Sequence, residues 1–207
     1  MSLLLAVSHD KTFPIKDAIT VGSPCNFDAF LWNGWDIDQQ VEMDGPPALG
    51  YAVRNKTLVT WFLANGANPN AGSNYDNAFS RAALLGEPEV IELLLSHGAN
   101  VDHGQVLHWA VERQHDACEV VKLLMDRGAP LHRLEYDGTA PMWSVLGLRS
   151  RGLGSPLHNA IAQGKVDVAS TLLDGGADPD FVDTKGKTCR DLARESSKTA
   201  AFTLLGL

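Results

Sequence analysis

The sequence predicts an all-α solenoid in which helix–turn–helix units stack in chain order, and three observations predict it. A short motif ending in glycine recurs five times along the 207 residues. Apolar residues at helical spacing precede each of these glycines, and an alanine lies 14 to 18 residues before each one. One such hairpin cannot bury its own apolar stripe, whereas stacked hairpins can, so the repeats predict a solenoid.

The five glycines set the period of the repeat. Their spacings are 32, 32, 30 and 48 residues. The first three spacings correspond to one repeat length, and the fourth is that length plus an insertion of roughly 15 residues. Each glycine is expected to end a helix in the left-handed conformation, which glycine adopts at little cost. The five are Gly34, Gly66, Gly98, Gly128 and Gly176.

Two helices are predicted in each repeat. The outer helix comes directly before the glycine, where apolar pairs such as Leu58/Val59 and Phe62/Leu63 share one face. The first copy of this stripe is the weakest. The inner helix precedes it and contains an alanine that lets two antiparallel helices approach closely. These alanines are Ala18, Ala52, Ala82, Ala110 and Ala160.

The motifs resemble the ankyrin repeat. The Thr-Pro-Leu-His-x-Ala opening of that family is best matched by Ser-Pro-Leu-His-Asn-Ala at 155–160, and more weakly by Gln-Val-Leu-His-Trp-Ala at 105–110. Its Gly-Ala-x-x-Asn/Asp closing is matched at 66–70, 98–102 and 176–180. The resemblance covers about residues 13–207. It implies an ankyrin-repeat solenoid with projecting β-turn fingers, whose inner helices and fingers line a concave groove.

We expect a single ankyrin-repeat domain over residues 1–207. It would consist of an N-terminal segment and capping repeat (1–45), central repeats (46–132), an inserted loop (133–154) and a C-terminal repeat with its cap (155–207). The inserted loop is about twice the usual finger length and rich in apolar residues. Two readings stay open for it: it folds back on the solenoid, or it covers part of the groove and makes a pocket.

Net charge restricts the class of partner that we expect, and cysteine content indicates the state of the thiols. The formal net charge is -8, and residues 1–44 hold seven acidic and two basic side chains, so no nucleic-acid partner is expected. A basic partner or solubility alone would explain this acidity. The widely spaced Cys25, Cys118 and Cys189 predict reduced, mostly buried thiols rather than disulfides. No apolar run predicts a membrane helix, and we expect a monomer in the cytoplasm or nucleus.

The histidines do not predict a metal or cofactor site. No pair of them has the spacing of a metal-binding motif, and no Cys-x-x-Cys occurs. His108 and His158 occupy the histidine position of the opening motif. The resemblance implies that each bonds to the backbone of a neighbouring turn.

Aromatic and arginine side chains mark the candidate binding surface, because such residues dominate binding hot spots. Trp109 leads this set, since it lies on an inner helix beside an unusually short finger. The inner helices contribute Tyr51, Arg54, Arg81, Leu84, Trp109, Glu112 and Arg113. The fingers contribute Asn74, Tyr75 and Asn77, and the inserted loop contributes Tyr136, Trp143, Arg149 and Arg151.

Two functions are carried forward. The first is a non-catalytic binding or scaffold module that holds a protein partner on its concave face, as the ankyrin resemblance implies. The alternative is a site for a small hydrophobic molecule, which could act without a cofactor as a cyclase- or isomerase-like proton-transfer enzyme. His108, Glu112 and Arg149 would be its polar groups. That alternative requires a closed pocket of roughly several hundred Å³ beneath residues 136–151.

Overall fold

The computed structural model describes most of the chain, and every regular element in the described part is a helix. The described residues are 13–43, 45–74, 76–138, 152–196 and 203–206. Their contacts group the chain into two compact units, unit 1 (Met1–Ala99) and unit 2 (Asn100–Leu207). No helix in the described ranges is long and apolar enough to cross a membrane.

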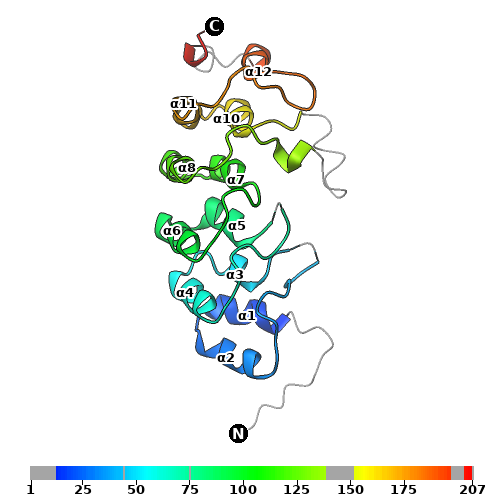
Figure 1. The fold of residues 1–207 in the computed structure, drawn as a ribbon, viewed down its shortest axis with the longest axis vertical. Helices are drawn as coiled ribbons and strands as arrows, with labels where there is room; N and C mark the ends of the chain where they lie inside the picture. Colours follow the sequence, from blue (N-terminus) through cyan, green and yellow to red (C-terminus); the bar gives the residue numbers. More distant parts are fainter. Residues whose placement is uncertain (1–12, 44, 75, 139–151, 197–202, 207) are drawn as a thin grey trace. The chain divides into compact units, whose positions relative to one another are not determined.

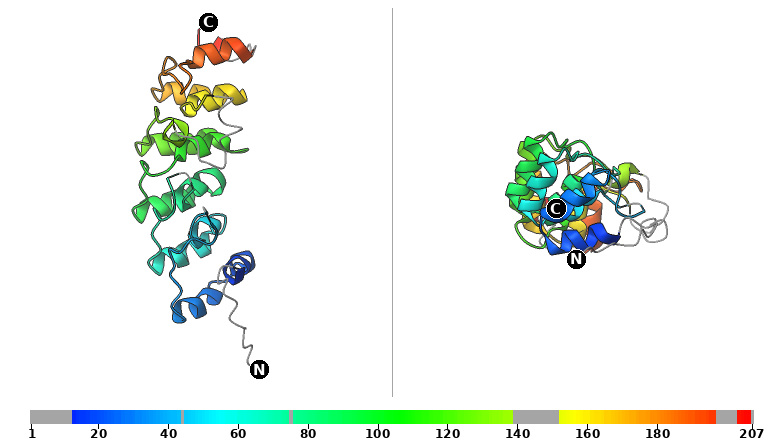
Figure 2. Two further views of the ribbon diagram at one scale, coloured as in Figure 1. Left: turned by 90° about the vertical axis from the view of Figure 1, so that its right-hand side faces the viewer. Right: turned by 90° about the horizontal axis from the view of Figure 1, so that it is seen from below.

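Unit 1 contains three helical hairpins that follow one another in chain order (Figures 1 and 2). Its helices are α1 (Phe13–Val21), α2 (Cys25–Trp32), α3 (Ala48–Tyr51), α4 (Lys56–Ala64), α5 (Ala78–Leu85) and α6 (Pro88–Ser96). The inner helix α3 contacts both α1 and α5, and the outer helix α4 contacts α6. Inner and outer helices therefore form two layers, as a stacked repeat requires.

Unit 2 repeats the same arrangement and closes with a single helix. Its elements are α7 (Val106–Glu112), α8 (Ala117–Asp126), the 3-10 helix η1 (Glu135–Gly138), α10 (Pro156–Gln163), α11 (Val166–Asp174) and α12 (Cys189–Ser196). The inner helix α10 contacts α7 on one side and α12 on the other, while the outer helices α8 and α11 contact each other. After α12, the predicted C-terminal cap is described only at residues 203–206, where Leu205 is buried.

The predicted apolar stripes form the core. Leu58, Val59 and Phe62 of α4 are fully buried, as are the matching residues of α6 and α8. The weak first stripe is completed by aromatic packing, because the Phe27 ring of α2 lies 5.0 Å from that of Phe62 and 5.5 Å from that of Trp61. Large aromatic rings replace the missing aliphatic pair in the first repeat.

The glycines end the outer helices as predicted. The φ angles of Gly34, Gly66, Gly98, Gly128 and Gly176 lie between 76° and 93°. No heavy atom lies within 4 Å of where a Cβ would stand at any of them, so the left-handed backbone and not space requires glycine. The next N–H then bonds back into the helix, as from Ala99 to the Leu94 carbonyl at 3.0 Å.

Narrow turns precede the inner helices and form the fingers. Antiparallel bridges close them between Gln40 and Pro47, Gly72 and Asn77, and Val182 and Thr188. We use "finger" for the segment between an outer helix and the next inner helix. The fingers that the ankyrin resemblance implied are therefore present in both units.

Two predicted inner-helix residues lie outside the inner helices. Helix α3 is only one turn long, which places Arg54 in the turn before α4, and Arg113 follows the end of α7. Gly50 is a weak helix former at the centre of α3, which favours the early end. The thiols also differ from the prediction: Cys189 is buried, Cys118 is half-buried and Cys25 is exposed. Cys25 is exposed because it lies on the outward face of the first outer helix.

Candidate functional site

In unit 1, the Arg81 side chain is held on two sides. Its Nε and Nη2 donate to the two carboxylate oxygens of Asp76 at 2.6 and 2.8 Å, which is a bidentate ion pair between α5 and the finger before it. The guanidinium carbon also lies 4.4 Å from the centre of the Tyr51 ring. The hydrogen bond to Asp76 raises the pKa of Arg81, so the guanidinium stays charged. Arg81 therefore joins its own finger to the inner helix of the preceding repeat.

Tyr51 extends this contact toward the first repeat. Its hydroxyl donates to the Glu42 carboxylate in the finger before α3, and Glu42 also pairs with Lys16 of α1. Partial burial raises the pKa of the Tyr51 hydroxyl, so it stays protonated and can act as the donor. The result is a row of alternating charges and one aromatic ring that runs from α1 to α5. We call Lys16, Glu42, Tyr51, Arg81 and Asp76 the unit 1 ladder.

The other predicted residues of unit 1 surround this ladder with different exposures. Arg54 and Asn74 are exposed, and Leu84 is half-buried. Asn77 is fully buried, because its side chain accepts from the Ser80 N–H at 2.8 Å and caps α5. Asn77 is therefore a structural residue and cannot contact a partner. Tyr75 lies outside the described residues.

The finger segments of unit 1 carry only acidic charge. Residues 33–47 and 65–77, the two fingers between its helices, contain no lysine or arginine. Their acidic residues are Asp36, Asp38, Glu42, Asp44 and Asp76. Two of these are paired with cations from inner helices, Glu42 with Lys16 and Asp76 with Arg81. The finger side of unit 1 is thus an acidic rim beside an aromatic and guanidinium platform.

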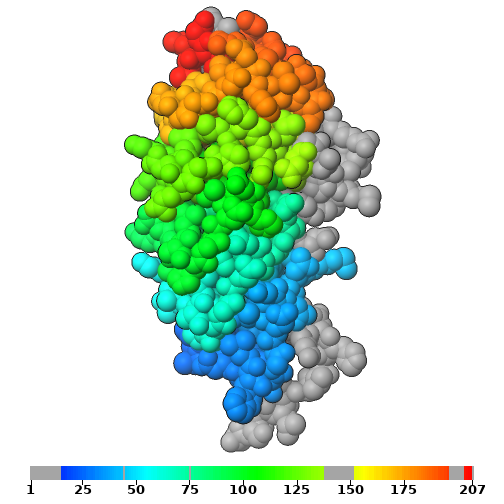
Figure 3. Space-filling view, in the orientation of Figure 1, coloured from blue at the N-terminus to red at the C-terminus, as the bar shows by residue number. Residues whose placement is uncertain are grey.

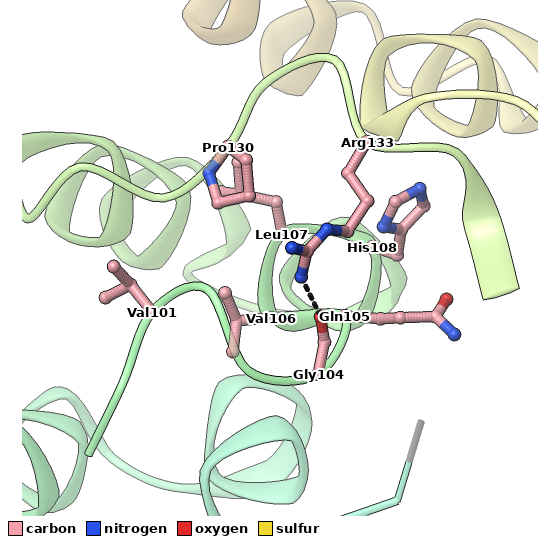
Figure 4. Close-up of a pocket in the computed structure, with 8 residues that line it drawn as sticks. All are labelled: Val101, Gly104, Gln105, Val106, Leu107, His108, Pro130 and Arg133. Carbon is pink, nitrogen blue, oxygen red and sulfur yellow. Dashed lines mark hydrogen bonds between the residues drawn. The ribbon is translucent and has the colours of Figure 1, made fainter. Parts of the chain in front are cut away.

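In unit 2, His108 and the ends of the inserted loop come together. The His108 Nε2 lies 3.1 Å from the Gly154 carbonyl oxygen, and the Glu135 N–H donates to the same oxygen at 2.8 Å. The Arg133 guanidinium donates to the carbonyls of Asp102 and Gly104, the latter at 3.1 Å (Figure 4). The insertion thus leaves and rejoins the repeat at a hydrogen-bonded base.

The cavity at this base is very small. It is lined by Gln105, His108 and Arg133 among others and has a volume of about 10 Å³ (Figure 4). That is room for about one water molecule, not for a hydrophobic substrate. The larger pocket predicted beneath residues 136–151 depends on residues 139–151, which lie outside the described part. Trp143, Arg149 and Arg151 lie outside it as well.

His158 has two hydrogen-bond partners on opposite sides of its ring. Its Nδ1 accepts from the Ser155 N–H at 3.2 Å and lies 2.9 Å from the Ser155 hydroxyl. The Nε2 must then carry the proton, and it donates to the Lys187 carbonyl at 3.1 Å. Burial lowers the pKa of His158, which favours this neutral form. These hydrogen bonds cap α10 and hold the finger between α11 and α12. Neither ring nitrogen of His158 remains available to a substrate.

The remaining predicted residues of unit 2 are engaged with neighbours. Trp109 is half-buried on α7, and the Glu112 carboxylate accepts from the Gln163 amide of α10. Arg113 is buried and forms a bidentate pair with Asp116 at 2.8 to 3.1 Å, which holds the α7–α8 turn. Tyr136 is half-buried with a left-handed φ of 52°. Arg113 therefore has a structural role that the sequence analysis did not foresee.

Comparison with models of protein families identifies the family to which the repeats belong. A model described as ankyrin repeats in three copies matches residues 16–105 and 49–135, and a single ankyrin repeat matches residues 154–184. The chain belongs to the ankyrin-repeat family. The histidine bonds described above are those that the opening motif of this family implied, and they are confirmed for both His108 and His158.

Known relatives share the repeats over part of their length. The chain is 34% identical to Ankyrin repeat and SOCS box protein 11 of Danio rerio over 121 residues, 56% of this chain and 35% of that protein. It is 27% identical to Inversin of Canis lupus familiaris over 144 residues, 64% of this chain and 12% of that protein. The chain thus spans about a third or less of these two relatives.

A solved structure shares the fold along nearly the whole chain. It is an ankyrin repeat domain from Acinetobacter baumannii AYE, which superposes with a TM-score of 0.69 at 24% identity. The match covers 93% of this chain and 96% of that one. At this identity the match shows the all-α ankyrin solenoid and nothing about the partner.

Two side-chain contacts between neighbouring ankyrin repeats of unit 2 were not predicted from the sequence. The His132 Nε2 accepts from the Asp178 N–H at 2.9 Å, and its ring lies 5.5 Å from that of Phe181. In Figure 3 the orange surface of the finger between α11 and α12 lies directly against the yellow-green surface of the chain. Lys165 donates to the carbonyls of Val111 and Arg113 at 2.6 and 2.9 Å. Neither could be read from the sequence, because each joins residues more than 40 positions apart.

Proposed function

We propose that this ankyrin-repeat chain is a non-catalytic protein-binding module that holds its partner on the inner helices and fingers of unit 1. Members of the family generally mediate protein–protein interaction, which supports the class. The placement of Arg81 between the Tyr51 ring and the Asp76 carboxylate is the observation that supports this surface.

The ladder favours binding because its anchors are already ordered. Arginine and tyrosine are frequent hot-spot residues, and ordering a flexible side chain such as arginine on binding costs about 0.5–1.5 kcal/mol. Here the Arg81 guanidinium is fixed by two hydrogen bonds and a ring contact before any partner arrives. A partner would meet a rigid platform beside the exposed Arg54 and the half-buried Leu84.

The acidic rim indicates the charge of the partner segment. Since the finger segments of unit 1 contain acids and no lysine or arginine, the partner segment carries basic residues that complement them. Affinity should then fall as salt rises, because exposed charge pairs are screened beyond about 10 Å at about 0.1 M salt.

Quantitative co-purification tests this proposal. The full chain is used as bait in extract from its native source, and proteins retained by the wild type are compared with those retained by Tyr51→Ala and Leu84→Glu. Lys56→Glu is the matched control, since Lys56 is an exposed residue of the outer helix α4. We expect a specific protein to be lost at least about tenfold from both inner-face variants and kept by the control.

The contrary result is equally clear. If both inner-face variants are folded by circular dichroism and retain every protein that the wild type retains, the partner does not contact the unit 1 ladder. Retention that is unchanged between about 0.05 and about 0.5 M NaCl would contradict the basic partner alone.

A further inference from the structure

The inner helices of unit 1 place equivalent positions side by side. Helix α3 contacts α1 on one side and α5 on the other (Figure 1). Two positions after the inner-helix alanine of each repeat stand Thr20, Arg54 and Leu84. Since stacked repeats bring equivalent positions together, these three residues form a row. The row lies at the turn end of the inner helices, which is the end that leads into the outer helix and not the end that follows the finger.

Arg54 is the cation of this row, and it has no acidic partner. Residues 13–99 contain only Lys16, Arg54, Lys56 and Arg81 as lysines or arginines. Lys16 and Arg81 are paired with acidic residues of the fingers. Arg54 and Lys56 are exposed, and neither forms an ion pair with any residue that the structure describes. Lys56 begins the outer helix α4, so Arg54 is the cation that the described inner face of unit 1 leaves for a partner.

The surroundings of Arg54 are mostly uncharged. The turns 22–24 and 52–55 contain no acidic residue, and the Asn55 amide lies beside Gly22, 3.0 Å from where a Cβ would stand. The next turn contains Glu87, which is the residue before α6 and is not paired with Arg54. Unit 1 therefore has an acidic rim at its finger end and an exposed guanidinium at the turn end. Such a guanidinium can bind a carboxylate through two parallel hydrogen bonds.

We propose that Arg54 binds an acidic side chain of the protein partner and thereby sets the direction in which the partner segment lies. The inference rests on the proposed function, in which that segment contacts the inner helices and fingers of unit 1. A basic residue of the segment meets the acidic rim, and an acidic residue meets Arg54, because complementary charges fix the register of an interface. The reversed direction would place like charges together at both ends and is disfavoured.

Peptide display with the full chain as bait tests this direction. A library of random peptides of about 12 residues, which extend to about 40 Å, is selected in parallel on the wild type, Tyr51→Ala, Arg54→Glu and Lys56→Glu. Lys56→Glu is the matched control, because it changes the net charge as much as Arg54→Glu does, two residues away on the outer helix. We expect peptides enriched on the wild type and on the control to carry a basic residue and, always on the same side of it, an acidic one.

The affinity of one enriched peptide measures the contribution of the charge. Arg54→Glu should weaken binding about tenfold by fluorescence anisotropy, because it sets two carboxylates against each other, and Lys56→Glu should leave it unchanged. Replacing the acidic residue of the peptide by lysine should restore binding to Arg54→Glu. Exchanging the places of its basic and acidic residues should weaken binding to the wild type about tenfold. Circular dichroism checks that each variant is folded.

The outcomes separate this inference from the proposed surface. Peptides that need Tyr51 but bind Arg54→Glu as tightly as the wild type would overturn the role of Arg54 and leave the unit 1 surface standing. Peptides that bind Tyr51→Ala as tightly as the wild type, or no enrichment on the wild type, would overturn the surface and the role of Arg54 together.

Discussion

The two units fasten their fingers to their inner helices by different chemistry. In unit 1 the link is a surface ladder of charges and one aromatic ring, in which Arg81 pairs with Asp76 and Tyr51 with Glu42. In unit 2 it is a buried imidazole, with His108 bonded to the Gly154 carbonyl and His158 to the Lys187 carbonyl.

Because of this difference, the histidines of unit 2 stabilise the fold, whereas the side chains of the unit 1 ladder can contact a partner. A buried imidazole that satisfies a carbonyl is costly to remove and is hidden from any partner. A partly exposed guanidinium on an aromatic ring adds little to stability and remains in reach of a partner. Unit 2 should therefore respond to histidine substitutions and acid, and unit 1 to salt and to changes in the ladder.

The largest effect is expected from His158→Ala. The substitution leaves the buried Ser155 N–H and the Lys187 carbonyl without their side-chain partner and opens a cavity, which should lower the free energy of unfolding by about 3 kcal/mol. Urea denaturation followed by circular dichroism measures it. His97→Ala is the control, because His97 is exposed. A loss no larger in His158→Ala than in His97→Ala would contradict the structural role.

Acid should weaken the same link. Burial lowers the pKa of His158 in the folded chain from its ordinary value of 6.5, so the unfolded chain binds the proton more tightly. Stability should therefore fall as the pH drops below about 6.5 toward 5. The slope over this window should be smaller in His158→Gln, measured by urea denaturation at each pH. Parallel slopes in the two proteins would show that other groups cause the decline.

Matched glycine substitutions compare the two units at a position where they do not differ. Gly66→Ala in unit 1 and Gly176→Ala in unit 2 each place a Cβ at a φ near 90° with no heavy atom within 4 Å. Each should cost about 1 kcal/mol of unfolding free energy, from backbone strain alone. Thermal and urea denaturation of both variants checks this. Losses differing by more than about 1 kcal/mol would mean that one of these helix ends carries an additional constraint.

The smallest effect on stability is expected from Arg81→Ala. Its loss removes a partly exposed ion pair and a ring contact, which should cost about 0.5–1 kcal/mol in low salt and less in about 1 M NaCl. Urea denaturation at the two salt concentrations gives the comparison. A loss that is independent of salt would assign the role of Arg81 to packing rather than charge.

The sequence predicted the fold far better than the site. Period, apolar stripes and terminal glycines each depend on neighbours in sequence, and all are confirmed in the described ranges. The role of Arg113 was missed because an exposed arginine and a buried one have the same sequence context until the turn is built. Asn77 was predicted to contact a partner, although an asparagine at the start of a helix is also a common cap. The Arg81–Tyr51 contact joins two repeats, so residue type could nominate both side chains but could not place one over the other.

Hydrogen–deuterium exchange of the chain with and without its captured partner tests the central claim most directly. The partner should slow amide exchange in residues 40–54 and 76–84, which include the fingers and inner helices around the unit 1 ladder. Slower exchange confined to the outer helices α4 and α6, with these residues unchanged, would place the partner elsewhere and contradict the account.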